Sequence, residues 1–359
     1  MTPPLLTVLG SLAISFIACW LLMRVAAPIG LIDHPGGRKD HAHAIPLVGG
    51  LAIYFTLLIG WLSGFIALDS AMLLALTLVL IIGVADDIRE IGPKPKTIMQ
   101  ALAVLVMVFS AGVILKSVGN LIGLGPIGMS IFAIPMTVFA ALGVINAINM
   151  VDGMDGLAGT LSFIAVTAYA YVAHLSGLTT QLSVLLALAG ALVGFLLLNM
   201  RLPWQARARL FLGDTGSMLL GFILAWFAID LTHGPGRSFP PICALWVIVL
   251  PLCDCVSLML RRIGAGKSPF VADRQHLHHL MLDHYQSVPK AHAVISILSL
   301  LTAAVGIVGW QYQVPEPILF VGFVALFIGY HIAMKRAFRH RDVNNTGLQA
   351  APAVTHPPQ

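Results

Sequence analysis

The chain has 359 residues, of which 58% are hydrophobic and only 10% are charged, and its formal net charge is +5. About a quarter of the residues of a soluble protein are charged. This composition therefore excludes an ordinary soluble domain and predicts an all-α, polytopic integral membrane protein. The basic residues follow the loops between apolar runs and do not form one patch, which argues against a nucleic-acid partner.

Eleven apolar runs follow one another along the chain, most of them close to the roughly 20 residues that cross a bilayer. They cover residues 5–23, 47–66, 71–85, 97–115, 129–148, 157–175, 182–200, 217–231, 240–260, 293–312 and 318–334. The sequence therefore predicts about eleven transmembrane helices in a single domain over residues 1–340. The polar, proline-containing segment 341–359 is expected to be a disordered tail.

The loop charges predict the orientation of these helices. No Lys or Arg precedes the first apolar run, so we expect a retained helix with its N-terminus outside. With that start, only Lys116 and Arg237 fall in outside loops, and the other 18 of the 20 basic residues face inside. Because basic loops stay in the cytoplasm, the sequence predicts a cytoplasmic C-terminus and cytoplasmic polar motifs.

The first inside loop, HPGGRKDHAHAIPLVGG, carries a group of basic side chains that includes Arg38 and His43. Such a group suits an anionic phosphate. A solvated positive-inside loop explains the same residues, so both interpretations stay open.

Asp86 and Asp87 end the third apolar run, in LVLIIGVADD. Two adjacent acids at the C-terminus of a helix repel each other and oppose the helix dipole. A bound cation would relieve both costs, although solvation at a helix end is an equally good account of this pair alone.

Four polar side chains recur at every third residue in NAINMVDGMDGLAG, namely Asn146, Asn149, Asp152 and Asp155. On a helix this spacing forms one polar stripe. Amide and carboxylate oxygens suit a hard cation and can also read the edge of a nucleobase. A loop built from turn residues is the alternative.

Asp214 lies between two glycines in FLGDTGS, directly before another apolar run. This position predicts an N-cap for the following helix. It also fits magnesium, which takes one or two carboxylates together with substrate phosphates. The two roles are compatible.

A basic stretch, SPFVADRQHLHHLM, holds Arg274, His276, His278 and His279. Zinc would need a matching Cys or His pair elsewhere, and the sequence offers none with suitable spacing. The group is better suited to an anionic phosphate.

These segments, in this order, resemble one family, the polyprenyl-phosphate N-acetylhexosamine-1-phosphate transferases. The matching pieces are HPGGRKDHAHAIPLVGG, DDIREIGPKPKTIMQ, NAINMVDGMDGLAG, FLGDTGSMLLGF and SPFVADRQHLHHL. The last piece looks most like the branch that uses UDP-N-acetylglucosamine, because Leu277 interrupts its histidines. The resemblance implies that undecaprenyl phosphate attacks the UDP-sugar, giving undecaprenyl diphosphate-N-acetylglucosamine and UMP. It also implies a bacterial inner membrane and the first membrane step of an envelope polysaccharide, such as O-antigen.

The resemblance assigns roles to residues of this sequence. It makes Asp214 and Asp86 ligands of Mg²⁺, with Mn²⁺ as a substitute. The residues that it places at the reaction centre are Asp86, Asp87, Asp152, His276, His278 and His279. Those that it places against the substrates are Arg38, His43, Lys96, Asn149, Asp155, Asn199, Phe211 and Arg274. Within this last set, Asp155 and Phe211 match an acid that contacts uracil and a ring that stacks on it.

Several alternatives stay open at this point. The donor sugar could be N-acetylfucosamine, another 2-acetamido sugar or a muramoyl-pentapeptide, and a homodimer is open. An ion-coupled transporter would place carboxylates near the membrane midplane, and only Asp254 fits that position. Asp254 follows Pro251, which should kink its helix, and it suits either a functional role or a helix–helix hydrogen bond.

Overall fold

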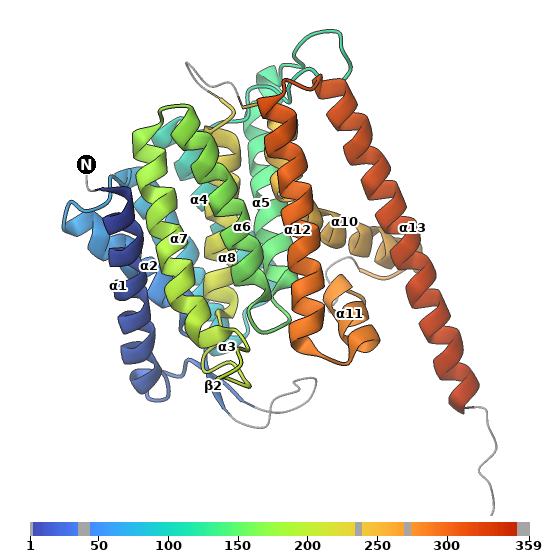
Figure 1. Cartoon of the computed structure of the whole chain (residues 1–359), viewed down its shortest axis with the longest axis horizontal. Helices are drawn as coiled ribbons and strands as arrows, with labels where there is room; N and C mark the ends of the chain where they lie inside the picture. Colours follow the sequence, from blue (N-terminus) through green and yellow to red (C-terminus); the bar gives the residue numbers. More distant parts are fainter. Residues whose placement is uncertain (1–2, 35–43, 234–238, 269–273, 350–359) are drawn as a thin grey trace, which may run out of the picture.

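The computed structural model describes residues 3–34, 44–233, 239–268 and 274–349 as a helical bundle (Figure 1). The helices are α1 (Pro4–Val25), α2 (Gly49–Leu62), α3 (Ser70–Arg89), α4 (Pro93–Ala111), η1 (Ser130–Phe132), α5 (Ala133–Val151), α6 (Leu157–Leu175), α7 (Thr179–Asn199), α8 (Gly213–Asp230), α9 (Pro241–Val247), α10 (Val249–Gly264), α11 (Leu277–Tyr285), α12 (Val288–Gln311) and α13 (Glu316–Gln349). Two short strands, β1 (Ile32–Asp33) and β2 (Ile45–Pro46), pair antiparallel.

Each of the eleven apolar runs overlaps a helix, which confirms the prediction of an all-α, multi-pass membrane protein. Within the described residues, eight helices are long and apolar enough to cross a bilayer, and nine if α9 and α10 form one broken span. The helices α2 and α8 lie outside that set, and α2 has only 14 residues. The predicted count of eleven crossings therefore stays a prediction.

The ninth apolar run is broken into α9 and α10, which meet at an angle of 82°. The break lies at Ile248, and Pro251 is the third residue of α10. Proline has no N–H to donate to the residue four positions earlier, and its ring clashes with that carbonyl, so it is tolerated only in the first turn of a helix. The predicted kink is therefore confirmed, and the bend lies three residues before Pro251.

The helix α8 lies inside the bundle and is approached closely by α2 and α3. A Cβ atom on Gly50 of α2 would collide with the backbone of Gly216, and one on Gly83 of α3 would collide with the backbone of Thr215. These glycines let the helix axes come closer than larger residues would allow. The first turn of α8, which contains Asp214, is therefore fixed against two neighbouring helices.

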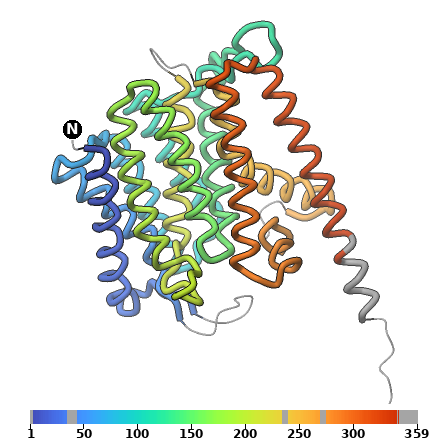
Figure 2. Tube along the Cα trace, viewed as in Figure 1, coloured from blue at the N-terminus to red at the C-terminus, as the bar shows by residue number. Residues whose placement is uncertain are grey.

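The C-terminal helix α13 leans away from the bundle, and α10 runs sideways towards it, with α11 beside α12 (Figures 1 and 2). The helix α13 continues to Gln349, beyond the boundary that the sequence placed at residue 340. Residues 350–359 of the predicted tail lie outside the described residues.

All four cysteines are free and buried. They are Cys19 in α1, Cys243 in α9, and Cys253 and Cys255 in α10. Each packs as a small apolar side chain among the helices.

Candidate active site

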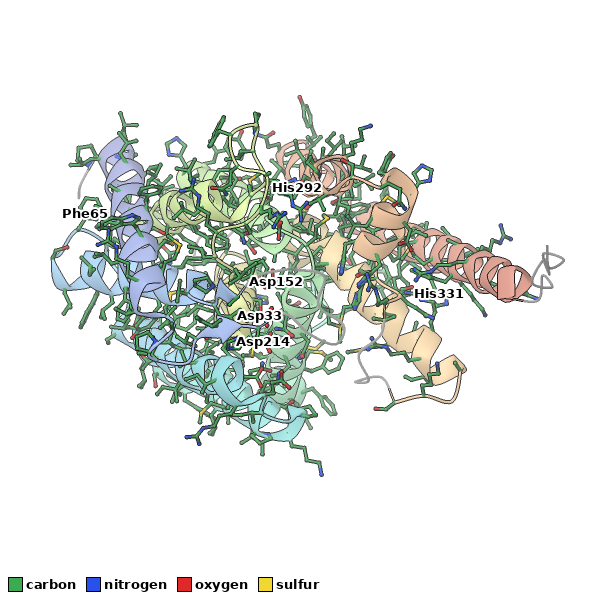
Figure 3. All side chains as sticks on the ribbon, turned by 90° about the horizontal axis from the view of Figure 1, so that it is seen from below. Asp33, Phe65, Asp152, Asp214, His292 and His331 are labelled. Atoms are coloured by element: carbon green, nitrogen blue, oxygen red, sulfur yellow. The ribbon has the colours of Figure 1, made fainter. Side chains whose placement is uncertain are left out.

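A cavity of about 1520 Å³ opens at the end of the bundle where α3, α5 and α7 end and α8 begins. Ten of the residues that the sequence proposed for the site line it, namely Asp86, Asp87, Lys96, Asp152, Asp155, Asn199, Phe211, Asp214, Arg274 and His279. Seen from below in Figure 3, the labelled Asp33, Asp152 and Asp214 lie towards the middle of the bundle. Helix ends on one side of the bundle thus bring together motifs that are far apart in the sequence.

Three of these side chains, Asp86, Lys96 and Asp214, form what we term the acidic centre together with Asn149, which lies behind them. The Lys96 ammonium lies 2.7 Å from Oδ2 of Asp86 and 3.2 Å from Oδ2 of Asp214. Asn149 donates from Nδ2 to Oδ1 of Asp214 and to the Ser217 hydroxyl, at 2.9 Å each. One lysine thus bridges two carboxylates from different helices, which lowers their mutual repulsion.

Asp87 makes different contacts from its neighbour Asp86. Its carboxylate accepts the backbone N–H groups of Asp214 at 2.7 Å and Thr215 at 3.1 Å, and the Thr215 hydroxyl at 2.6 Å. A negative side chain that accepts from the first turn of a helix satisfies free N–H groups and favours the helix dipole. Asp87 therefore fixes the start of α8, and with it the position of Asp214.

The donor set of the acidic centre fits a hard cation. The Oδ1 atom of Asp86 is buried and has no hydrogen-bond partner. The Asp214 side chain is 38% exposed and lines the cavity. Within the described residues no three His, Cys, Asp or Glu side chains gather as a complete metal site. Magnesium does not need such a set, because it takes one or two carboxylates and keeps waters or substrate phosphates.

Asp152 is the C-cap of α5 and lies beside the acidic centre. Burial raises the pKa of this carboxyl to about 8, and the neighbouring carboxylates, Asp214 first, add to the rise. With no cation bound, Asp152 therefore holds a proton at neutral pH.

A second group of residues surrounds the part of the cavity near the end of α7. Arg201 donates from Nε to Oδ2 of Asp155 at 2.7 Å. Asn199 is buried and joins two loops, because its Oδ1 accepts the Gly156 N–H and its Nδ2 donates to the Leu210 carbonyl, both at 2.8 Å. The contacts of Asn199 support the loops around the cavity.

Phe211 reaches the cavity because its backbone is attached to the chain after β2. Its N–H donates to the Pro46 carbonyl at 2.8 Å, and its carbonyl accepts the Gly49 N–H at 3.0 Å. These bonds extend the small β1–β2 hairpin to the segment before α8. The aromatic ring is thereby held at the cavity wall, two residues before that helix begins.

The three histidines form a stack at the start of α11. The ring centroids of His276 and His278 lie 5.3 Å apart with planes 13° from parallel, and those of His278 and His279 lie 4.1 Å apart. Only His279 lines the cavity, whereas His276 and His278 are buried behind it. Burial lowers the pKa of His278 to about 3 and that of His279 to about 4. These two rings are neutral at pH 7, so Arg274 is the positive charge at this wall.

Some site residues were missed by the sequence analysis, and two could not be placed. Arg38 and His43 lie outside the described residues. Asp33, Arg89, Glu90 and Arg201 line the cavity although the sequence assigned them no role. Asp33 directly precedes the motif HPGGRK, so a wider reading of that segment could have found it, whereas nothing local to Arg201 indicates its ion pair with Asp155.

Comparisons with known proteins identify relatives of this chain. Glycosyl transferase family 4 matches residues 70–232. Two curated proteins named undecaprenyl-phosphate alpha-N-acetylglucosaminyl 1-phosphate transferase are similar to this chain. The one from Salmonella typhi is 34% identical over 342 residues, which is 93% of each chain. The one from Haemophilus influenzae is 34% identical over 335 residues, which is 92% of this chain and 94% of the relative.

Proposed function

We propose that this chain, which belongs to glycosyl transferase family 4, transfers N-acetylglucosamine 1-phosphate to undecaprenyl phosphate. The donor is UDP-N-acetylglucosamine, and the products are undecaprenyl diphosphate-N-acetylglucosamine and UMP. The chain is thus a glycosyl-1-phosphate transferase of the membrane.

One observation supports this function best. A single cavity at the helix ends is lined by the acidic centre, by an aromatic ring with a neighbouring carboxylate, and by a wall that carries the Arg274 guanidinium. A diphosphate needs charge neutralisation, a uracil needs a stacking face and an acceptor for its N–H, and a second phosphate needs a cation. The cavity provides these three environments together.

The reaction exchanges one phosphoanhydride for another. An oxygen of the lipid phosphate attacks the β-phosphorus of the UDP-sugar, a new P–O bond forms, and the bond to the α-phosphate breaks with UMP as the leaving group. The lipid phosphate has a second pKa near 6 and is largely dianionic at pH 7. It therefore needs no general base, and we assign Asp86 to positioning and charge balance.

Asp86 and Asp214 would hold Mg²⁺, or Mn²⁺ in its place. When bound, the cation neutralises negative charge on the diphosphate. Lys96 adds a positive charge between the same two carboxylates. Asp87 keeps Asp214 in place through the first turn of α8, and Asn149 orients the Asp214 carboxylate.

We assign Phe211 and Asp155 to the uridine, and Arg274 with His279 to the sugar and phosphate end. Phe211 offers a stacking face, and Asp155 offers an acceptor for the imide N–H. Arg201 pairs with Asp155, so the uridine would have to share that carboxylate.

We place the protein in the bacterial inner membrane, with the cavity and the C-terminus in the cytoplasm and the N-terminus outside. The basic loops support this orientation. Cysteine labelling of Ser268→Cys, in the exposed segment after α10, should require lysis of the cells, whereas Leu124→Cys, in the loop after α4 and 88% exposed, should react in intact cells. The opposite labelling pattern would show that the chain has the reverse orientation in the membrane.

Purified protein tests the activity directly. With magnesium, undecaprenyl phosphate and UDP-N-acetylglucosamine, we expect UMP release that depends on the lipid acceptor. Other UDP-2-acetamido sugars in the same assay determine the donor. UMP release that is independent of the acceptor would indicate hydrolysis, and no release with any donor would overturn the proposed function.

A further inference from the structure

Asp254 is a buried carboxylate in α10 that lies away from the acidic centre. It is 2% exposed and accepts three hydrogen bonds. The donors are Nδ1 of His276 at 2.8 Å, the Leu277 N–H at 3.0 Å and the Tyr330 hydroxyl at 2.7 Å. A carboxylate is costly inside a membrane protein unless several donors compensate it, and these donors come from two neighbouring segments, the start of α11 and α13.

The contact with His276 determines the state of that ring. An ionised carboxylate can only accept, so the Nδ1 atom that faces it must carry hydrogen. The ring of His276 stacks on His278, and the ring of His278 lies 4.1 Å from that of His279 at the cavity wall, with the two planes tilted by 35°. The carboxylate in α10 is therefore connected to the cavity through three adjacent imidazoles.

The contact with Leu277 determines the direction of α11. His276 is the N-cap residue of this helix, and its side chain makes no capping hydrogen bond. Asp254 accepts the N–H of the first helical residue instead, and a negative charge there favours the helix dipole. Asp254 thus replaces the local cap and attaches the start of α11 to α10.

The histidine stack also contacts the polar loop after α5. A Cβ atom on Gly153 would collide with the His278 ring, so this ring packs directly against the backbone beside Asp152. A change in the angle of α11 would therefore move His279 at the cavity wall and the loop that carries Asp152.

We infer that Asp254 is a positioning residue of the transferase site, which holds His276 with hydrogen on Nδ1 and, through the stacked rings, holds His279 at the cavity. This inference rests on the proposed function. The alternative is that Asp254 only attaches α13 to α10 through Tyr330 and does not position the histidines.

Asp254→Asn separates these roles, because the amide keeps the shape and its oxygen can still accept from Leu277 and Tyr330, while its NH₂ group faces Nδ1 of His276. Groups that orient metal-bound histidines contribute about 10- to 100-fold, and by analogy we expect kcat to fall by that order with the KM for each substrate little changed. The matched control is Tyr330→Phe, which removes a donor to the same carboxylate and leaves His276 untouched. This control should keep turnover close to that of the wild type.

A double-mutant cycle tests whether the effect passes through His276. We expect Asp254→Asn to cause no further loss in a His276→Ala background, because the interaction is already absent. An equal loss of turnover in both backgrounds, or equal losses for Asp254→Asn and Tyr330→Phe, would show a structural attachment and overturn the inference.

A spectroscopic measurement on the wild type keeps the inference testable if Asp254→Asn does not fold. ¹⁵N NMR of histidine-labelled protein in detergent, assigned with His276→Ala, should show a protonated Nδ1 for His276. An Nε2–H tautomer with bare Nδ1 would overturn the inference. Wild-type UMP release is measured in the same preparation, so a failure of the proposed function is recognised separately from a failure of the positioning role.

Discussion

The acidic centre and the histidine stack face the same cavity but are held in different ways. The acidic centre sits on long helices of the bundle, and close glycine contacts fix α8 against α2 and α3. The histidine stack sits on α11, a helix of nine residues beside the bundle, and depends on one carboxylate of α10. Helix packing therefore fixes the charged half of the site, whereas a few buried hydrogen bonds fix the other half.

The two regions also differ in charge. Lys96 is shared between two carboxylates, whereas burial keeps His278 and His279 neutral. Neutral rings donate hydrogen bonds without adding charge, so the positive charge at the cavity comes from the Lys and Arg side chains that line it, namely Arg89, Lys96, Arg201 and Arg274. The variants below are expected to affect the two regions differently.

The largest effect is expected from Asp214→Asn. Loss of a carboxylate that would bind magnesium should lower turnover by at least about 100-fold, or about 2.7 kcal/mol of transition-state stabilisation. The matched control is Asp230→Asn at the other end of α8, where the carboxylate accepts from Gln181. UMP release and the apparent Tm should be measured for both. Asp214→Asn activity above a tenth of wild type at saturating magnesium would contradict the assignment.

A smaller effect is expected when the packing that supports the acidic centre is changed. In Gly83→Ala, the new methyl group would meet the Thr215 backbone, and overpacking of this kind costs about 1–3 kcal/mol. We expect a lower Tm and lower turnover, because α3 and α8 carry the opposing carboxylates. Gly143→Ala in α5 is the control, since a Cβ there has no neighbour within 4 Å. Equal behaviour of the two variants would show that the close contact is unimportant.

Asp155→Ala and Phe211→Ala should weaken the nucleotide end more than the lipid end. A stacked aromatic ring contributes about 1–3 kcal/mol per base, so the KM for the UDP-sugar should rise by roughly 5- to 150-fold in Phe211→Ala. Trp204→Ala is the control, since that ring is 72% exposed in the preceding loop. A rise confined to the lipid substrate would mean that the uridine is assigned to the wrong wall.

Two buried side chains of the site should give opposite pH dependences of stability. The pKa of Asp152 is about 8 in the folded chain, above the ordinary Asp value, so the folded state binds the extra proton and its stability falls as pH rises from about 4 to 8. The pKa of His278 is about 3, so the unfolded state binds the extra proton and stability falls as pH drops below about 6.5.

Thermal unfolding in magnesium-free detergent at about pH 5 and about pH 8 measures the direction of both pH dependences of stability. Asp152→Asn should gain stability relative to wild type mainly at the higher pH. His278→Gln should lose part of the acid sensitivity at the lower pH, because the pKa of His279 is also lowered. If Asp152→Asn were more stable than wild type only at the lower pH, the predicted direction for Asp152 would be wrong. Unchanged acid sensitivity in His278→Gln would contradict the predicted direction for His278.

The sequence predicts the helical bundle well because hydrophobicity alone marks long apolar helices. It also predicts the gathering of Asp86, Asp152 and Asp214, because charges at helix ends on one side of a membrane must meet at one level. The break of the ninth run near Pro251 follows from the missing N–H of proline. These features depend on residue type and order.

The remaining features depend on partners that are distant in the sequence. Asp87 and Asn199 bond backbone groups more than ten residues away, and no local pattern indicates that their side chains are occupied in this way. The short helix α11 lies in a polar stretch whose start is capped by Asp254, over 20 residues earlier. The count of crossings is also not determined by hydropathy, because α2 is short and the chain bends sharply between α9 and α10.

The burial of all four thiols has a practical consequence for spectroscopy. Each of them lies within a helix and packs among its neighbours, so aqueous thiol reagents have no ready native target in the folded chain. A spin label or fluorophore can be attached to an introduced surface cysteine without first replacing the native ones. One label near α11 and another on the loop after α4 would report distances across the bundle in an otherwise unmodified sequence.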